Sequence, residues 1–314
     1  MKRVSTPMMA ALLAAIIGVI TSGCGSHNLN GTSDKNPALL FAPNVSAVQQ
    51  QQVQVALNEY IQQCMSAHGF TYLAVPEPLS NFISLGDPSN PLYVDVTALK
   101  TDGYGEYSSF EESQSHPGVD GSSPDPNNAY VDSLSDSQQA AYNRDIAGTK
   151  TSHVAMPDGS SVDYVAGGCH GEAEDAIYGS AVKYIGDFTY AQNTIIAISN
   201  QARQAESWKH VVTKWGTCMA RAGFPYTSRD QAEKNVYKRY SQSGANAASV
   251  HEYEVSVASA DAACVESTHM NQVSHAAVEA AAKSASNTQI AGILAWDNML
   301  AHAAKQASVV LARG

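Results

Sequence analysis

The sequence predicts a mainly α-helical fold, built from two disulfide-stapled helical modules, with a small β-hairpin and a long irregular insertion in the first module. The stretch CMSAHGFTY at residues 64–72 returns as CMARAGFPY at residues 218–226, with Cys, Met, Gly, Phe and Tyr at the same places. Eight of the twelve prolines fall between residues 76 and 157, so helix-breaking residues are rare afterwards. Four of the five cysteines lie beyond the N-terminal segment, and an even number of cysteines in an exported chain favours their pairing in disulfides.

The N-terminal residues have the pattern of an export signal. A basic start, MKR, precedes an apolar run at residues 8–20 that is too short to span a bilayer, and TSGC follows it. The residues before Cys24 resemble the lipobox of bacterial lipoproteins, although Thr21 stands where Leu is usual. We expect a lipoprotein signal peptide at residues 1–23 and acyl chains such as palmitate on Cys24, which anchor the protein to a membrane without crossing it. An ordinary secretory signal, or a short uncleaved anchor, is the alternative.

Each copy of the repeated motif is predicted to end a helix. Apolar residues recur at spacings of three and four, as on the buried face of a helix, in two stretches that stop at Gly69 and Gly223: Val53, Leu57, Tyr60, Ile61 and Cys64 in the first, and Trp208, Val211, Trp215, Cys218 and Ala222 in the second. Glycine there permits the left-handed residue that closes many helices. Each cysteine should therefore lie in the last two turns of its helix.

The first module is predicted to carry an insertion. Its cysteines, Cys64 and Cys169, are 105 residues apart (169 − 64), whereas Cys218 and Cys264 are 46 apart (264 − 218). Residues 76–128 are rich in Gly, Pro, Ser, Asn and Asp, which predicts a long irregular surface segment.

A helix and a hairpin are expected after this segment. Ser135 and Gln138 have capping-box spacing and begin a helical pattern that stops at Gly148. The sequence Pro-Asp-Gly at residues 157–159 separates two alternating apolar runs, which predicts a β-hairpin. A short helix should follow from Cys169 to Gly179.

The C-terminal stretch from Asn271 to Gly314 is predicted to be a long helix, since it lacks proline and its interior contains one glycine, Gly292. Its apolar residues alternate at three and four as in a coiled-coil seam: Ile293, Trp296, Leu300, Ala303, Ala307 and Val310. We expect this helix to pack on its own domain, because alanines at the seam bury little area. A helix that binds a partner or a second copy is the alternative.

The four cysteines Cys64, Cys169, Cys218 and Cys264 are expected to form two disulfides. Pairing within each module, Cys64 with Cys169 and Cys218 with Cys264, is favoured because it needs no exchange between modules. Cys64 with Cys218 and Cys169 with Cys264 is the next alternative. No pair has the close spacing of a zinc site, so we expect no metal and no cofactor.

Composition limits the partners. The formal charge of −11 becomes −13 when Lys2 and Arg3 leave with the signal (−11 − 2), and no basic stretch is suited to phosphates, so we expect no nucleic acid partner. We expect the protein lipid-anchored on the outer face of the cell membrane, where an envelope protein or a cell-wall component is a possible partner. The expected division is a signal peptide at 1–23, a tether at 24–45, the first module at 46–186 and the second module, with the long C-terminal helix, at 187–314.

Several stretches together resemble a known group. CMSAHGF, AYVDSLSDSQQAAYNRDIAG, GGCHGEAEDAIYG and CMARAGFPY, in this order behind a lipobox, look like uncharacterised secreted lipoproteins of actinobacteria. The likeness covers about residues 46–268. It implies a secreted location and a disulfide framework, and it implies no activity.

Catalytic candidates are few. Glu172, Glu174 and Asp175 gather on one short helix, where they suit general acid and base groups or calcium ligands, but acidic residues at a helix start are more often solvated surface. SAVK at residues 180–183 matches the S-x-x-K of penicillin-recognising enzymes, but KTS at residues 150–152 precedes it, and that order is reversed from the family. The histidines His68, His170 and His251 have no partner visible in the sequence.

We therefore assign no catalytic residue. The expected role is that of a non-catalytic binding or interaction module of the cell envelope, with an envelope hydrolase acting on peptidoglycan or peptides as the alternative. Whether the protein is an enzyme is not decided by its sequence. A hydrolase needs converging catalytic groups in a concave pocket, whereas a binding module does not.

Overall fold

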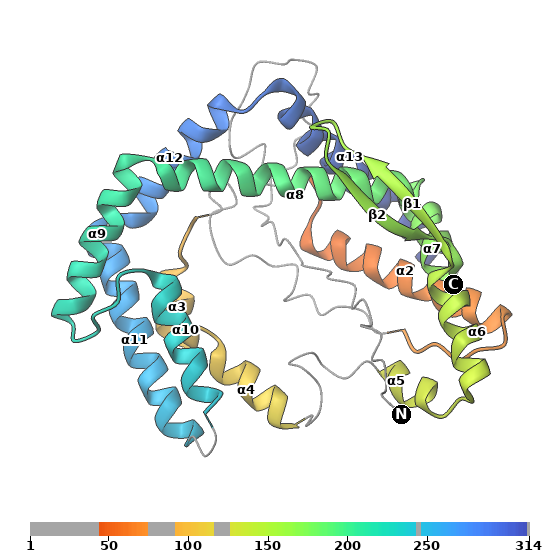
Figure 1. Ribbon diagram of the computed structural model, residues 1–314, viewed down its shortest axis with the longest axis horizontal. Helices are drawn as coiled ribbons and strands as arrows, with labels where there is room; N and C mark the ends of the chain where they lie inside the picture. Colours follow the sequence, from red (N-terminus) through yellow and green to blue (C-terminus); the bar gives the residue numbers. More distant parts are fainter. Residues whose placement is uncertain (1–43, 75–91, 116–125, 243–245, 313–314) are drawn as a thin grey trace, which may run out of the picture.

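The computed structural model describes residues 44–74, 92–115, 126–242 and 246–312. The predicted signal peptide, Cys24 and most of the tether lie outside these residues. Within the described residues there are twelve helices and one two-stranded antiparallel sheet, which confirms the mainly helical prediction. The elements form an arch, with the long helix α8 (Ala181–Gln204) across the top and a group of helices below each of its ends (Figure 1).

One leg of the arch contains the first copy of the motif. It is built from α2 (Ala47–Ala67), α6 (Asp136–Ala147) and α7 (Gly168–Tyr178). The capping box predicted from Ser135 and Gln138 begins α6. Side chains from all three helices form one buried cluster that includes Ile61, Met65, Tyr142, Cys169 and Ala173.

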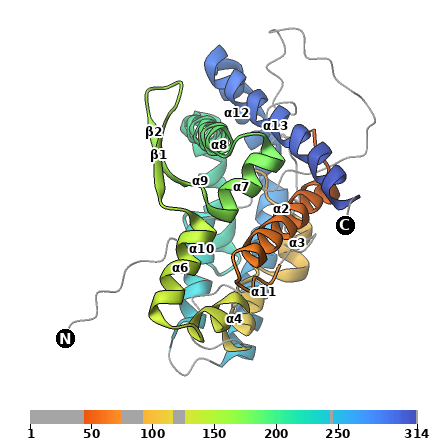
Figure 2. The ribbon, with the colours of Figure 1, turned by 90° about the vertical axis from the view of Figure 1, so that its right-hand side faces the viewer.

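The predicted hairpin is present between α6 and α7. Strands β1 (Lys150–Ala155) and β2 (Ser161–Ala166) pair antiparallel, with Val154 opposite Val162. Gly159 has a φ of +83°, which glycine adopts without strain, and the Ser160 N–H donates to the Asp158 carboxylate at 3.0 Å. Figure 2 looks along α8 and shows the hairpin beside this helix. Both strands contact α8.

The segment predicted to be irregular contains helices, so that prediction is wrong in part. The described portions of residues 76–128 include α3 (Val96–Asp102), α4 (Glu106–Ser115) and the start of α5 (Pro126–Asp132). The Asp95 carboxylate caps α3 by accepting the N–H groups of Thr97 and Ala98, both at 2.9 Å. Leu99 is buried in the core of the other leg. Tertiary contacts therefore order a sequence whose local composition favours loops.

The other leg contains the second copy of the motif. It consists of α9 (Glu206–Arg221), α10 (Arg229–Tyr240) and α11 (Ala247–Thr268), with α3 and α4 packed against them. The fully buried Trp215 lies in the middle of this core. Residues 94–110, which precede the hairpin in sequence, thus contribute to the core formed by the second copy.

Long helices connect the two legs. Residues 186 and 187, where the sequence analysis divides the modules, lie inside the continuous helix α8. Ala191, Ile198 and Ala202 of α8 share a buried cluster with Ala277 and Val278 of α12 (Met270–Ser284).

The predicted single C-terminal helix is two helices. After α12 ends, Ala285 and Ser286 take extended backbone angles, and a capping box of Ser286 with Gln289 begins α13 (Asn287–Leu311). A serine whose hydroxyl accepts a hydrogen bond from a backbone N–H favours the start of a new helix over a continuous helix. Helix α13 packs intramolecularly, against α2, α7 and α8, with Ala303 and Ala307 fully buried. The expectation that this part of the chain packs on its own domain is thus confirmed for α13.

Glycine is required where α8 and α13 cross. A Cβ built on Gly292 would lie 2.3 Å from the ring of Tyr190, which is itself buried.

None of the described helices combines the length and apolar character needed to cross a bilayer.

Candidate functional site

The two disulfides pair as favoured from the sequence. Cys64 bonds to Cys169, with Cα atoms 5.6 Å apart, and Cys218 bonds to Cys264, with Cα atoms 5.7 Å apart. We call these bonds the first staple and the second staple. The alternative pairing of Cys64 with Cys218 is wrong. Each staple joins the end of the motif helix to a later helix of the same leg, α7 in one case and α11 in the other.

The repeated Met and Phe residues have matching roles in both copies. Met65 and Met219 are fully buried, and their carbonyl groups accept the N–H of Phe70 and Phe224, both at 2.9 Å. Each Phe then meets a Tyr ring of a second helix edge-on, with Tyr142 5.4 Å from Phe70 and Tyr253 6.0 Å from Phe224. In both copies the motif therefore ends a helix and fixes that end to the rest of its leg through a disulfide and an aromatic contact.

The three acidic candidates on α7 do not converge. Glu172 lies near the first staple, with its Oε2 3.7 Å from the Cys64 sulfur. Asp175 accepts the Ala181 N–H at 2.6 Å at the start of α8. Glu174 accepts a hydrogen bond from the Tyr164 hydroxyl of β2. Each carboxylate thus has a different neighbour, and the described residues do not join them in one catalytic pair.

Glu174 differs from the other two in its environment. Burial raises the pKa of the Glu174 carboxyl to about 7, with the negative charge of Asp175 adding to the effect, while the hydrogen bond from Tyr164 opposes it. Burial and the hydrogen bond to Glu174 also raise the pKa of the Tyr164 hydroxyl. Glu174 can therefore hold or release a proton near neutral pH.

The S-x-x-K stretch is the start of a helix. The Ser180 hydroxyl accepts the Lys183 N–H at 3.1 Å and so caps α8, and the Lys183 ammonium pairs with Asp187 one turn later. In this arrangement Ser180 and Lys183 have ordinary helix-stabilising roles.

A cavity of about 480 Å³ lies where the hairpin meets α8 and α13. Apolar walls come from the hairpin, including Met156 and Pro157, and from the helices, including Tyr190 and Ala295. The polar members of the lining include the Lys183 and Asp187 pair. A mostly apolar cavity with a few polar groups at one side is the usual form of a small-molecule site.

Comparison with known proteins identifies no relative. No family model, no curated protein and no solved structure matches the chain. The site must therefore be judged from its own geometry.

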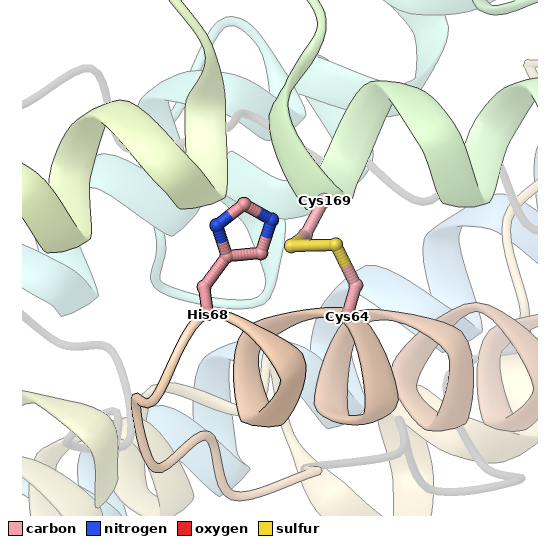
Figure 3. Close-up of side chains that lie close together, drawn as sticks. All are labelled: Cys64, His68 and Cys169. Carbon is pink, nitrogen blue, oxygen red and sulfur yellow. A yellow bond between two sulfur atoms is a disulfide. The ribbon is translucent and has the colours of Figure 1, made fainter.

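Two histidines have partners that the sequence analysis missed. His68 lies beside the first staple: one donor atom each of Cys64, His68 and Cys169 lie within 4.8 Å of one another (Figure 3). The His68 Nδ1 is 3.4 Å from the Asp145 carboxylate. His251 stacks on Tyr107 with ring centroids 4.1 Å apart. The exposed His170 begins α7 beside Cys169.

Two buried carboxylates on α11 were also missed. Glu254 accepts the backbone N–H groups of Tyr104, Glu106 and Tyr107 at 2.9–3.1 Å, and also the Tyr240 hydroxyl at 2.8 Å. It therefore caps the start of α4 from a distant helix. Gly103 leaves room for this carboxylate, because a Cβ there would lie 2.9 Å from it.

Asp261 makes a similar junction about two turns further along the same face of α11. It accepts the Trp215 indole N–H at 2.8 Å, the Arg229 guanidinium at 2.7 Å and the Tyr104 hydroxyl at 3.1 Å. Both acids are fully buried. The signal in the sequence was their helical spacing, because Glu254, Val257, Asp261 and Cys264 lie on one face of α11. These two carboxylates therefore join α4, α9 and α10 to α11 by hydrogen bonds.

Proposed function

We propose that the protein is a lipid-anchored protein of the cell envelope, held on the outer face of the cell membrane, where it binds a ligand or partner without converting it chemically. Two features support the location: the lipobox that ends at Cys24, and two disulfides, which persist in oxidising compartments outside the cytoplasm.

The cavity between the hairpin, α8 and α13 is the observation that carries the binding role. Its volume of about 480 Å³ is within the range of small-molecule sites. Gly186 keeps α8 close to the hairpin at this place, since a Cβ there would lie 2.9 Å from Val154. The walls are thus built from elements fixed by close packing, and a ligand would meet a largely preformed surface.

The lining indicates the chemistry of the ligand. Met156, Pro157 and Tyr190 offer apolar and aromatic contact, and Lys183 with Asp187 offers charge at one side. A mostly apolar small molecule with one polar or charged group would satisfy both parts. We propose this class of ligand for the cavity.

Membrane fractionation tests the anchor. We expect the wild-type protein in the membrane fraction and labelled by a palmitate analogue, and the Cys24→Ala variant to be soluble or to accumulate unprocessed. Recovery of mature wild-type protein without an acyl group would contradict the anchor.

A fluorescent apolar anion, 8-anilinonaphthalene-1-sulfonate, tests the cavity. We expect saturable binding of one probe per folded chain and loss of this binding in Ala295→Trp, which fills the cavity from α13. Ile196→Ser is the matched control, because Ile196 is an exposed apolar residue of α8 and is not part of the cavity wall. Equal binding by wild type and Ala295→Trp would contradict the cavity as the site.

An envelope hydrolase is the second candidate, and one feature favours it: burial raises the pKa of the Glu174 carboxyl to about 7, a value that suits a general acid. A Glu174→Gln variant should abolish any hydrolysis of peptidoglycan fragments or peptides. Hydrolysis that survives this change would remove Glu174 from the mechanism.

A further inference from the structure

The two cysteines of the first staple lie beside a histidine, and both residue types are common metal ligands. Cys64 comes from the end of α2, Cys169 from the first turn of α7, and His68 from the residue that ends α2. One donor atom from each lies within 4.8 Å of the other two. In the bonded state the two sulfurs are not thiolates, and thiolates are the form that binds metal.

The second staple provides an internal comparison. His68 follows Cys64 by four positions, and Ala222 stands at the same place after Cys218. The Cα separations of the staples differ by only 0.1 Å, 5.7 against 5.6 Å. Since the second copy forms the same helix end without a histidine, the fold does not require His68.

The histidine is also oriented as a metal ligand. Its Nδ1 lies 3.4 Å from the Asp145 carboxylate, which is mostly buried, and Figure 3 shows the other ring nitrogen on the side of the two sulfurs. Metal-binding histidines commonly donate one ring N–H to a carboxylate and coordinate with the other nitrogen. The Asp145 carboxylate beside Nδ1 favours the proton on that nitrogen, which leaves the lone pair of Nε2 on the side of the sulfurs.

Glu172 is placed to complete the set. Its Oε2 is 3.7 Å from the Cys64 sulfur, whereas the neighbour at the same distance from Cys218 is the hydroxyl of Ser267. Tetrahedral zinc with Zn–S bonds of about 2.3 Å separates two thiolate ligands by about 3.8 Å. The Cα atoms of Cys64 and Cys169 lie 5.6 Å apart, so rotation of the two side chains after reduction can bring the thiolates to this separation.

We propose that the reduced form of the first staple binds one zinc ion through Cys64, Cys169 and His68, with Glu172 as the fourth ligand and Asp145 orienting the histidine. A dithiol reductant supplies two electrons and two protons, so that the disulfide becomes two thiols and the reductant becomes a disulfide. Zinc then displaces the two thiol protons. The disulfide and the zinc are alternative cross-links between α2 and α7, and this proposal does not depend on the proposed envelope role.

Cobalt tests the site, because tetrahedral cobalt with thiolate ligands has characteristic visible and charge-transfer absorption. The Cys218→Ser/Cys264→Ser variant isolates the first staple, and a phosphine reductant opens it without offering competing thiols. We expect one cobalt per reduced chain, displaced by zinc, and no binding by the oxidised chain. His68→Ala should weaken binding by more than about 100-fold, and Asp145→Asn by about 10-fold.

The second staple supplies the matched control. In the Cys64→Ser/Cys169→Ser background, the reduced chain should show no tetrahedral cobalt spectrum. Adding Ala222→His to this background should strengthen cobalt binding at Cys218 and Cys264. Circular dichroism follows folding: zinc should raise the melting temperature of the reduced first-staple chain, and His68→Ala should remove this increase. Absence of cobalt binding, binding unaffected by His68→Ala, or a reduced chain that zinc leaves unfolded would each overturn the proposal.

Discussion

The Asn44 backbone N–H donates a hydrogen bond of 2.6 Å to the Asp297 carboxylate, across 253 positions of sequence. The Asn44 side-chain amide donates to the second oxygen of the same carboxylate. Burial raises the pKa of Asp297, and these two hydrogen bonds oppose that effect. The end of the predicted tether is thereby fixed to α13.

Asp297→Ala should free this end of the chain. Two donors lose their acceptor, so we expect a loss of about 2 kcal/mol in unfolding free energy. Hydrogen exchange at residues 44–50 should accelerate. Glu279→Ala, which breaks an exposed pair with Lys283, is the control and should leave stability nearly unchanged. Unchanged exchange at residues 44–50 in Asp297→Ala would show that the contact does not hold the segment.

Glu254→Gln should loosen the junction between α4 and α11. An amide has one acceptor oxygen where the carboxylate has two, so some of the four donors to Glu254 lose their partner. We expect a destabilisation of about 3 kcal/mol and faster hydrogen exchange at residues 104–107. The exposed Glu252, on the same helix, gives the control variant Glu252→Gln. Equal effects of the two substitutions would contradict the role of Glu254.

Glu174 should make stability depend on pH. Its pKa is about 7 in the folded chain and 4.5 as the ordinary value, so the folded chain holds a proton that the unfolded chain has lost between these pH values. Stability therefore falls as pH rises from about 4.5 to 7, by about 3 kcal/mol in all.

Urea unfolding of Glu174→Gln across this range is the measurement. The variant keeps an uncharged side chain at every pH, so it should lack this fall and exceed wild type in stability above pH 7. In Tyr164→Phe the hydrogen bond that lowers the Glu174 pKa is lost, and the fall should extend to higher pH. A pH dependence shared by wild type and Glu174→Gln would refute the assignment.

Reduction should destabilise both legs of the arch. On the chain-entropy model, closing loops of 105 and 46 residues stabilises the folded chain by about 5 and about 4 kcal/mol. The Cys218→Ser/Cys264→Ser and Cys64→Ser/Cys169→Ser variants should each melt well below wild type. Calorimetry without added metal measures this, and peptide mapping without reduction checks the pairing. A peptide that joins residues 64 and 218 would be incompatible with the fold.

Local signals in the sequence predicted the local structure. The Pro-Asp-Gly turn marked the hairpin, the spacing of Ser135 and Gln138 marked a helix start, and glycines marked both motif ends. The staple pairing followed because each cysteine lies near its partner within one leg. These features depend on residues close in sequence or on a repeated pattern.

The features that were missed depend on distant residues. Helices α3 and α4 are stabilised by burial of Leu99 and by Glu254, about 150 positions later, so their own composition indicated a loop. The role of His68 depends on its contacts with Asp145 and Cys169, which are distant in sequence, so no local pattern could predict it. The helices against which α13 packs could not be predicted either, because a seam of alanines fits many helix surfaces.

The packing of α13 on α2 sets the order in which the chain can fold during its synthesis. Helix α2 is synthesised early, yet Val53 and Ala56 share their core with Ala303 and Ala307 of α13. Until α13 follows, that face of α2 stays exposed to solvent and to other chains. This leg can therefore be completed only after α13 has been made, and chains truncated before residue 287 should be targets for chaperones and proteases.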